Sequence, residues 1–199
     1  MSEEGKPLNA LLVVGNLAKE STTRTVMVQL QDLLVAEGCQ VDLFDCADEP
    51  LPLFDVKTSY SSESFPGIKE RVVQADAIII GTPDYHGCMS GATKNFLDHF
   101  WKEYGGKLFG SVVGSYEKGL TVHDQIRTVA RQCYAWSMPY GVSFHEKADF
   151  EDGNAIGENL NNRLLMLAAD VAQYGRLLAR QRAKDLASDG PGFMAHYRS

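Results

Sequence analysis

The chain has 199 residues, 44% hydrophobic and 23% charged, which is the composition of one ordinary globular domain. Its 19 basic and 26 acidic residues give a formal net charge of −7, which disfavours nucleic-acid binding because phosphate contacts need a basic face. No apolar run approaches the roughly 20 residues of a membrane span, and the acidic first residues do not resemble a signal peptide. Four cysteines lack the spacing of a disulfide scaffold or a zinc site, so we expect a cytoplasmic protein.

Apolar runs and helical periodicity alternate from the first residues onward. The run at 8–14 predicts a strand buried on both faces, and apolar side chains at helical spacing predict a helix over 25–37 that ends at Gly38. A second strand is predicted at 41–44. The Pro- and Ser-containing segment 46–65 is then expected to be a long loop.

The middle of the chain continues this alternation. Pro66 suits the first turn of a helix over 66–75, and residues 76–81 form the most apolar predicted strand. A loop through Ser90 precedes a helix over 91–102, and a fourth strand is predicted over 107–115.

In the last part, a helix is predicted over 121–136 and a strand over 140–145. A polar loop over 146–157 and a long amphipathic helix over 158–184 are expected to follow. The ends, 1–7 and 186–199, are expected to be flexible extensions of a single domain over 1–199. Five strands alternating with five helices indicate an α/β protein with a parallel sheet. Such sheets bind ligands at the carboxyl ends of their strands, which directs attention to the loops after the first, third and fourth strands.

The loop after the first strand, residues 15–25, is rich in hydroxyl groups. Backbone N–H groups at a helix N-terminus, with Ser21, Thr22 and Thr23 beside them, suit a phosphate monoester. The loop matches neither the Walker pattern nor the G-x-G-x-x-G dinucleotide fingerprint. A helix cap without any ligand remains an equally open interpretation.

The loop after the third strand, residues 81–91, has a more specific pattern. Tyr85 lies between Pro83 and Gly87 at the end of the most apolar strand, which favours a flat wall for a planar heteroaromatic ring. Gly87 would let backbone N–H groups approach the edge of that ring.

Two other interpretations of this loop are a metal site and a catalytic thiol. Asp84, His86 and Cys88 could bind a metal, but three ligands within five residues match known sites poorly. Cys88 could be a nucleophile activated by His86 or His99, although a histidine two residues away rarely has suitable geometry. A serine hydrolase is disfavoured because no G-x-S-x-G motif is present.

Residues 82–98, TPDYHGCMSGATKNFLD, resemble the pattern T-P-E-Y-N-G-S-x-P-G-x-x-K-N-x-x-D of the NADPH-dependent FMN reductase family. The positions that match directly are Thr82, Pro83, Tyr85, Gly87, Gly91, Lys94, Asn95 and Asp98. The positions that differ are Asp84, His86, Cys88 and Ser90, where the family has Glu, Asn, Ser and Pro.

The first loop resembles the family's G-S-x-R-x-x-S-x-N pattern. Gly15 and Ser21 match it, whereas Asn16 stands at the serine and Thr23 at the asparagine. Ala18 occupies the position of the family's arginine, which contacts the phosphate. Lys19 or Arg24 would have to replace that contact here.

The resemblance implies a flavodoxin-like three-layer sandwich with a five-stranded parallel sheet of order 2-1-3-4-5 and helices on both faces. It implies an enzyme that transfers hydride from NAD(P)H to FMN and on to free flavin, a quinone or a similar small acceptor. The residues that it assigns to FMN binding are Asn16, Lys19, Ser21, Thr22, Thr23, Pro83, Asp84, Tyr85, His86, Gly87, Ser115 and Tyr116. Hydride transfer needs no side chain as acid or base, so neither a catalytic residue nor a metal ligand is named.

Two alternatives stay open: a flavodoxin-type electron carrier that does not oxidise NAD(P)H, and an α/β module without a flavin. The resemblance also implies a homodimer or homotetramer. The aromatic-rich segment after the flavin loop is a candidate interface, formed by Phe96, His99, Phe100, Trp101 and Tyr104. A helix buried within the subunit is the other explanation of these aromatic residues.

Overall fold

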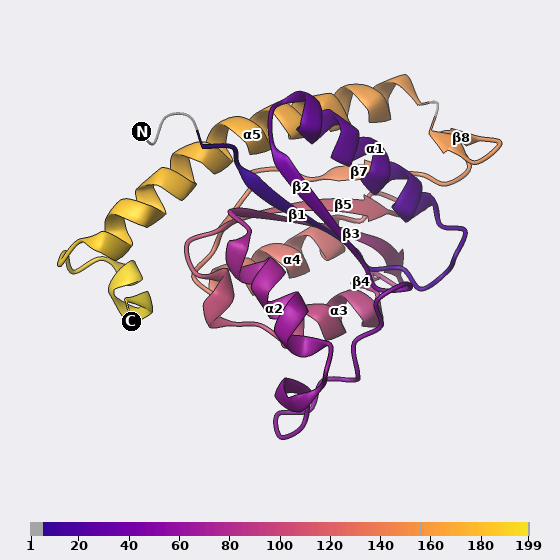
Figure 1. Ribbon diagram of the computed structural model, residues 1–199. Helices are drawn as coiled ribbons and strands as arrows, with labels where there is room; N and C mark the ends of the chain where they lie inside the picture. Colours follow the sequence, from indigo (N-terminus) through magenta and orange to yellow (C-terminus); the bar gives the residue numbers. More distant parts are fainter. Residues whose placement is uncertain (1–5, 156, 199) are drawn as a thin grey trace.

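A parallel β-sheet forms the centre of the protein in the computed structural model, which describes residues 6–155 and 157–198 (Figure 1). Its strands, in the order in which they pair, are β2 (Gln40–Asp45), β1 (Asn9–Val14), β3 (Ala77–Tyr85), β5 (Leu108–Gly114) and an edge divided between β6 (Trp136–Ser137) and β7 (Val142–Phe144). All these pairings are parallel. The predicted strand order 2-1-3-4-5 is confirmed.

Five helices cover the two faces of the sheet (Figure 1). One face is covered by α1 (Thr22–Ala36) and α5 (Glu158–Ala187). The other face is covered by α2 (Phe65–Gln74), α3 (Gly91–Asp98) and α4 (Leu120–Gln132). In β1, Leu12 packs in the first layer of core and Leu11 in the second. Because both faces are covered, strand positions pointing either way are apolar, which explains the continuous hydrophobic run at the start of the sequence.

The second half differs from the predicted element boundaries. The helix expected over 121–136 ends at Gln132, and Tyr134 adopts a left-handed conformation with φ of 56°. Trp136 therefore belongs to an edge strand, where its N–H donates to the carbonyl of Lys107 at 2.8 Å. Pro139 follows, and a proline cannot donate to a neighbouring strand, so the edge resumes only at β7.

Two further segments differ in length. The helix expected over 91–102 ends at Asp98, and a 3-10 turn follows at Lys102–Tyr104. The polar segment expected to be a loop over 146–157 contains a short hairpin, β8 (Phe150–Glu151) and β9 (Asn154–Ala155).

The C-terminal segment, which was expected to be flexible, packs against the domain. A 3-10 turn at Phe193–Tyr197 buries Met194, which is 1% exposed. Arg198 donates from Nε to the carbonyl of Asp185 at 3.0 Å. Of the N-terminal segment that was expected to be flexible, residues 1–5 lie outside the described residues, as does Ser199.

His123 joins three elements beneath the outer edge of the sheet. Its Nδ1 lies 2.7 Å from the hydroxyl of Ser111 on β5, and its Nε2 lies 3.0 Å from the hydroxyl of Ser143 on β7. Burial, together with the nearby charges of Arg127 and Arg163, lowers the pKa of His123 from 6.5 to about 4. The imidazole is therefore neutral at physiological pH.

We expect this histidine to make the protein acid-sensitive. The unfolded chain binds a proton at His123 near pH 6.5, but the folded chain does so only near pH 4, so the free energy of unfolding falls as the pH drops between these values. The expected loss is about 3 kcal/mol. Urea unfolding from pH 7 to pH 4 measures it, and His123→Gln should remove this part of the slope. An unchanged slope in that variant would refute the assignment.

Candidate functional site

A cavity of about 890 Å³ lies at the carboxyl ends of β3 and β5. The residues that line it are Asp84, His86, Gly87, Ser115, Tyr116, Glu117, Lys118, Gly119, Leu120 and Thr121. It therefore brings together five of the twelve residues that the sequence assigned to FMN binding, from two of the three loops. This is the edge of the sheet at which α/β proteins bind ligands.

A tight hairpin forms one wall of this cavity. The end of β3 pairs with β4 (Cys88–Met89) in antiparallel register, with Tyr85 opposite Cys88. The two residues between them, His86 and Gly87, have φ values of 59° and 79°, as a type I′ turn requires. Asparagine and glycine are the residues most suited to this turn, which gives a structural reason for the Asn-Gly of the family pattern and for the glycine here.

The carboxylate of Asp84 connects the hairpin to the loop after β5. Its Oδ1 accepts a hydrogen bond from the N–H of Gly87 at 2.7 Å, and its Oδ2 accepts one from the hydroxyl of Ser115 at 2.8 Å. Ser115 in turn accepts one from the N–H of Glu117 at 3.2 Å. Both walls of the cavity are thus fixed by one side chain, which prearranges their remaining backbone groups.

Two residues of α4 hold the hairpin from the other side, and sequence reasoning missed both. Thr121 donates from its hydroxyl to the carbonyl of Gly87 at 2.8 Å. Gln125 donates to the same carbonyl at 3.2 Å and accepts from the N–H of Met89 at 3.0 Å. Nothing in their local sequence marks them, because each acts on a hairpin more than 30 residues earlier in the chain.

Pro83 and Tyr85 do not line the cavity. Pro83 is buried within β3, where it is paired with Gly114. Tyr85 is 54% exposed, at a strand position whose side chain alternates with that of Asp84. Its predicted contact with the cofactor stays a prediction.

The hydroxyl-rich loop follows β1, and none of its predicted site residues lines this cavity. Ser21 is the N-cap of α1, and its Oγ accepts from the N–H of Arg24 at 3.4 Å. Asn16 accepts from the N–H of Ala18 at 2.9 Å, and Lys19 is exposed. The other two predicted residues of this loop open the helix, Thr22 half-buried and Thr23 buried.

The first loop and the hairpin are tied together through Ser90, the N-cap of α3. Its hydroxyl donates to the carbonyl of Gly15 at 2.5 Å, and its N–H donates to the hydroxyl of Thr82 at 3.1 Å. A Cβ on Gly15 would come within 1.8 Å of the Thr93 hydroxyl oxygen, so only glycine fits at the start of the first loop. The three loops therefore form one connected framework.

Arg24 places a guanidinium group next to Ala18, which stands at the position of the family's arginine. Its Nε donates to Asp45 at 2.5 Å, and its Nη1 bonds the carbonyls of Ala18 and Lys19. Its Nη2 is buried and has no hydrogen-bond partner among the described residues. A buried donor left over at a helix N-terminus fits a bound phosphate, so the donor set of this loop is compatible with the FMN phosphate.

The structure does not support a metal or thiol site in the hairpin. Within the described ranges, no group of three His, Cys, Asp or Glu side chains could hold a metal ion. His99 is 1% exposed, its Nδ1 lies 2.8 Å from the carbonyl of Asn95, and its ring packs edge-on against Phe54 at 5.2 Å. It is a core residue and does not serve as a base for Cys88.

The aromatic segment after the hairpin also proves to be core, so the prediction that it forms an interface patch is wrong. Phe96, Phe100 and Tyr104 are buried with His99, at no more than 4% exposure. Trp101 alone among the five is exposed, at 65%. These rings pack between the sheet and the segment before α2, as the contact of Phe54 with the ring of His99 at 5.2 Å illustrates.

None of the helices in the described part of the chain has the length and apolar character needed to cross a bilayer.

Comparison with known proteins identifies the family of this chain. The family model described as NADPH-dependent FMN reductase matches residues 8–149. An FMN-dependent NADPH-azoreductase of Staphylococcus aureus is 28% identical over 158 residues, covering 74% of this chain and 83% of that relative.

Solved structures share the fold. The flavoenzyme NAD(P)H:(acceptor) oxidoreductase FerB from Paracoccus denitrificans has a TM-score of 0.69 at 19% identity, over 87% of this chain and 98% of that one. A flavodoxin from the domain Archaea has a TM-score of 0.59 at 14% identity, over 85% and 99%. These likenesses confirm the flavodoxin-like fold, while the family match confirms the resemblance found in residues 82–98. The chain belongs to the NADPH-dependent FMN reductase family and is an oxidoreductase that works with FMN and NADPH.

Proposed function

We propose that the three connected loops hold FMN and that the enzyme passes electrons from NAD(P)H to a small acceptor such as free flavin, a quinone or an azo compound. The observation that carries this proposal is the hairpin wall, whose I′ turn is fixed by Asp84 and Thr121 at the edge of a preformed cavity. The azo compound is included because the Staphylococcus aureus relative is described as an azoreductase.

Each part of the framework has a separate task in this proposal. The N-terminus of α1, with Ser21, Thr22 and the unpartnered Nη2 of Arg24, would hold the phosphate. The backbone groups that Asp84, Thr121 and Gln125 leave free in the hairpin turn, and those of the loop beginning at Ser115, would hold the polar edge of the ring. When bound, FMN accepts hydride at its ring and releases the electrons to the acceptor.

The absorbance spectrum of the purified protein tests this proposal most directly. We expect a flavin spectrum, or its appearance on adding FMN, and bleaching on anaerobic titration with NADPH. Steady-state consumption of NADPH with free FMN or a quinone separates a reductase from a flavodoxin-type carrier. A protein without affinity for FMN would contradict the proposal.

Two further properties are part of the proposal. We expect the protein to act in the cytoplasm, which agrees with four cysteines that are all free. We also expect a homodimer or homotetramer, although the surface involved is not the buried aromatic segment. Light scattering at micromolar concentration measures the mass, and a monomer would contradict that expectation.

A charge change at Ser21 tests the phosphate site. Aspartate caps helices as well as serine does, so Ser21→Asp should preserve α1 while placing a negative charge beside the phosphate. We expect FMN affinity to fall about tenfold, a difference of about 1.4 kcal/mol. Fluorescence titration with FMN measures it, and Ser21→Asn is the neutral control of the same shape. Equal affinities in the two variants would remove the first loop from the site.

A further inference from the structure

A second cavity, of about 600 Å³, continues from the first along α4. The two share Glu117, Lys118 and Leu120 as lining residues. The second cavity extends from there to Arg127 on α4 and Arg163 on α5. A ligand longer than the first cavity therefore has a continuous path into the second.

Two guanidinium groups converge on this second cavity. Arg127 donates from Nη2 to the carbonyl of Pro139 at 2.5 Å, and Arg163 donates from Nη2 to the carbonyl of Gly141 at 2.5 Å. These carbonyls are two residues apart, and both positive charges act on the ring of His123. The Nε of Arg163 is buried and lacks a hydrogen-bond partner among the residues described. A guanidinium with an unused buried donor is a group that still needs an acceptor.

Three acidic residues line the second cavity with the two arginines and Lys118, and Asp124 alone among them pairs with either arginine. Asp149 accepts a hydrogen bond from the N–H of His145 at 2.7 Å, so its carboxylate is engaged by the backbone. Asp124 lies 3.4 Å from Arg127, but its side chain is 71% exposed, and exposed pairs of this kind are weak. Glu117 is exposed at the boundary with the first cavity. Arg163 forms no ion pair among the described residues.

We propose that the second cavity binds the 2′-phosphate of NADPH and that Arg127 and Arg163 give the enzyme its preference for NADPH over NADH. This inference rests on the proposed function, because it requires the nicotinamide to reach the first cavity. The rest of the dinucleotide must then lie outside that cavity, and the shared wall leads it to the two arginines. Two guanidinium groups are well matched to a phosphate dianion, which NADH lacks.

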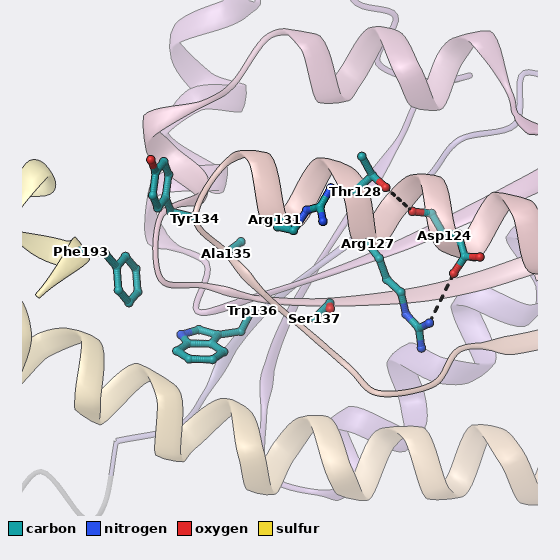
Figure 2. A pocket seen from close by; sticks show the side chains of 9 residues that line it. All are labelled: Asp124, Arg127, Thr128, Arg131, Tyr134, Ala135, Trp136, Ser137 and Phe193. Atoms are coloured by element: carbon teal, nitrogen blue, oxygen red, sulfur yellow. Dashed lines mark hydrogen bonds and ion pairs between the residues drawn. The ribbon is translucent and has the colours of Figure 1, made fainter.

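The test compares three arginine variants, two on α4 and one on α5. Arg127→Gln and Arg163→Gln remove the proposed contacts in turn. Arg131→Gln is the matched control, because Arg131 is an exposed arginine of α4 that does not line the second cavity. It lines the neighbouring hollow beside Tyr134 and Trp136, which Arg127 also lines (Figure 2). In the FMN-loaded enzyme, we expect each of the first two variants to lose about tenfold in kcat/KM for NADPH and to keep its value for NADH. The control should change neither value.

Direct binding of a nucleotide fragment gives a readout independent of turnover. Calorimetry on the FMN-loaded protein should detect adenosine 2′,5′-bisphosphate binding more tightly than adenosine 5′-monophosphate, with the difference lost in Arg127→Gln. This side chain is on the surface, so the variant is expected to fold even if Arg163→Gln does not.

Three results would overturn the inference: equal losses for both dinucleotides, an effect of Arg131→Gln as large as the others, or equal binding of the two fragments. Absence of NADPH and NADH oxidation, with the bisphosphate still bound through Arg127, would instead contradict the proposed function and leave the phosphate site standing.

Discussion

Replacing Gly87 by valine is expected to weaken FMN binding by at least about tenfold while the protein remains folded. Gly87 has a φ of 79°, a conformation that strains a β-branched residue by about 1–3 kcal/mol. A Cβ at this position would meet the Thr121 hydroxyl only at 3.5 Å, so strain in the turn, not collision, is the cause. The turn should open and displace the N–H and carbonyl that Asp84 and Thr121 now fix. FMN titration and NADPH oxidation measure the effect.

The chain contains a matched control for this substitution. Gly153, between β8 and β9, also has a φ of 79° and follows a left-handed residue, Asp152, but lies outside the candidate site. Gly153→Val should strain its turn to a similar extent and leave FMN binding intact. Tyr85→Ala should have a smaller effect, about 0.5–1.5 kcal/mol if the ring stacks on the cofactor. Full flavin content and turnover in Gly87→Val would exclude the hairpin from the flavin site.

The fold was predictable because burial on both faces leaves a strong sequence pattern. Leu11 and Leu12 face opposite layers of core, and both are at most 1% exposed, so β1 is read directly from its apolar run. The strand order came from the family resemblance, since alternation alone gives only the α/β class. The divided edge was less predictable, because an edge strand needs partners on only one side and its sequence is correspondingly less apolar.

The site was predictable where one local turn determines it. His86 and Gly87 are neighbours in sequence, and both adopt left-handed conformations. A short sequence motif can therefore encode the turn. Gln125 holds the same hairpin from a helix, through hydrogen bonds to residues 38 and 36 positions away in the chain. Such contacts depend on how α4 packs, and no local residue pattern encodes them.

The aromatic residues after the hairpin were wrongly assigned to an interface, because they are more numerous than one buried helix face needs. The structure shows that they are covered from within the chain by the long segment before α2. The N–H of Phe54 donates to the side chain of Asn95 at 2.8 Å, which fixes that segment over α3. Phe54 then packs against Tyr60 at 6.0 Å and against His99. Because α3 is covered by this segment as well as by the sheet, it is apolar on more than one face.

Removing the carboxylate of Asp84 should affect both walls of the cavity at once. In Asp84→Ala the N–H of Gly87 and the hydroxyl of Ser115 lose their shared acceptor, and each unmet group costs about 1–3 kcal/mol where it is buried. The hydroxyl of Ser115 would keep only its contact with the N–H of Glu117. The hairpin and the loop after β5 would then be joined through Thr121 and Gln125 of α4 but no longer through Asp84. We expect FMN affinity and kcat/KM for NADPH to fall at least about tenfold.

Asp84→Asn is the graded control for this result. Its amide oxygen still accepts from Gly87, but its NH₂ group cannot accept from the hydroxyl of Ser115. FMN affinity in this variant should therefore lie between those of the wild type and Asp84→Ala. Thermal unfolding followed by circular dichroism checks that all three proteins are folded at the assay temperature. If Asp84→Ala bound FMN as tightly as the wild type, the carboxylate would be a local turn residue, and the two cavity walls would have to be positioned by Thr121 and Gln125 alone.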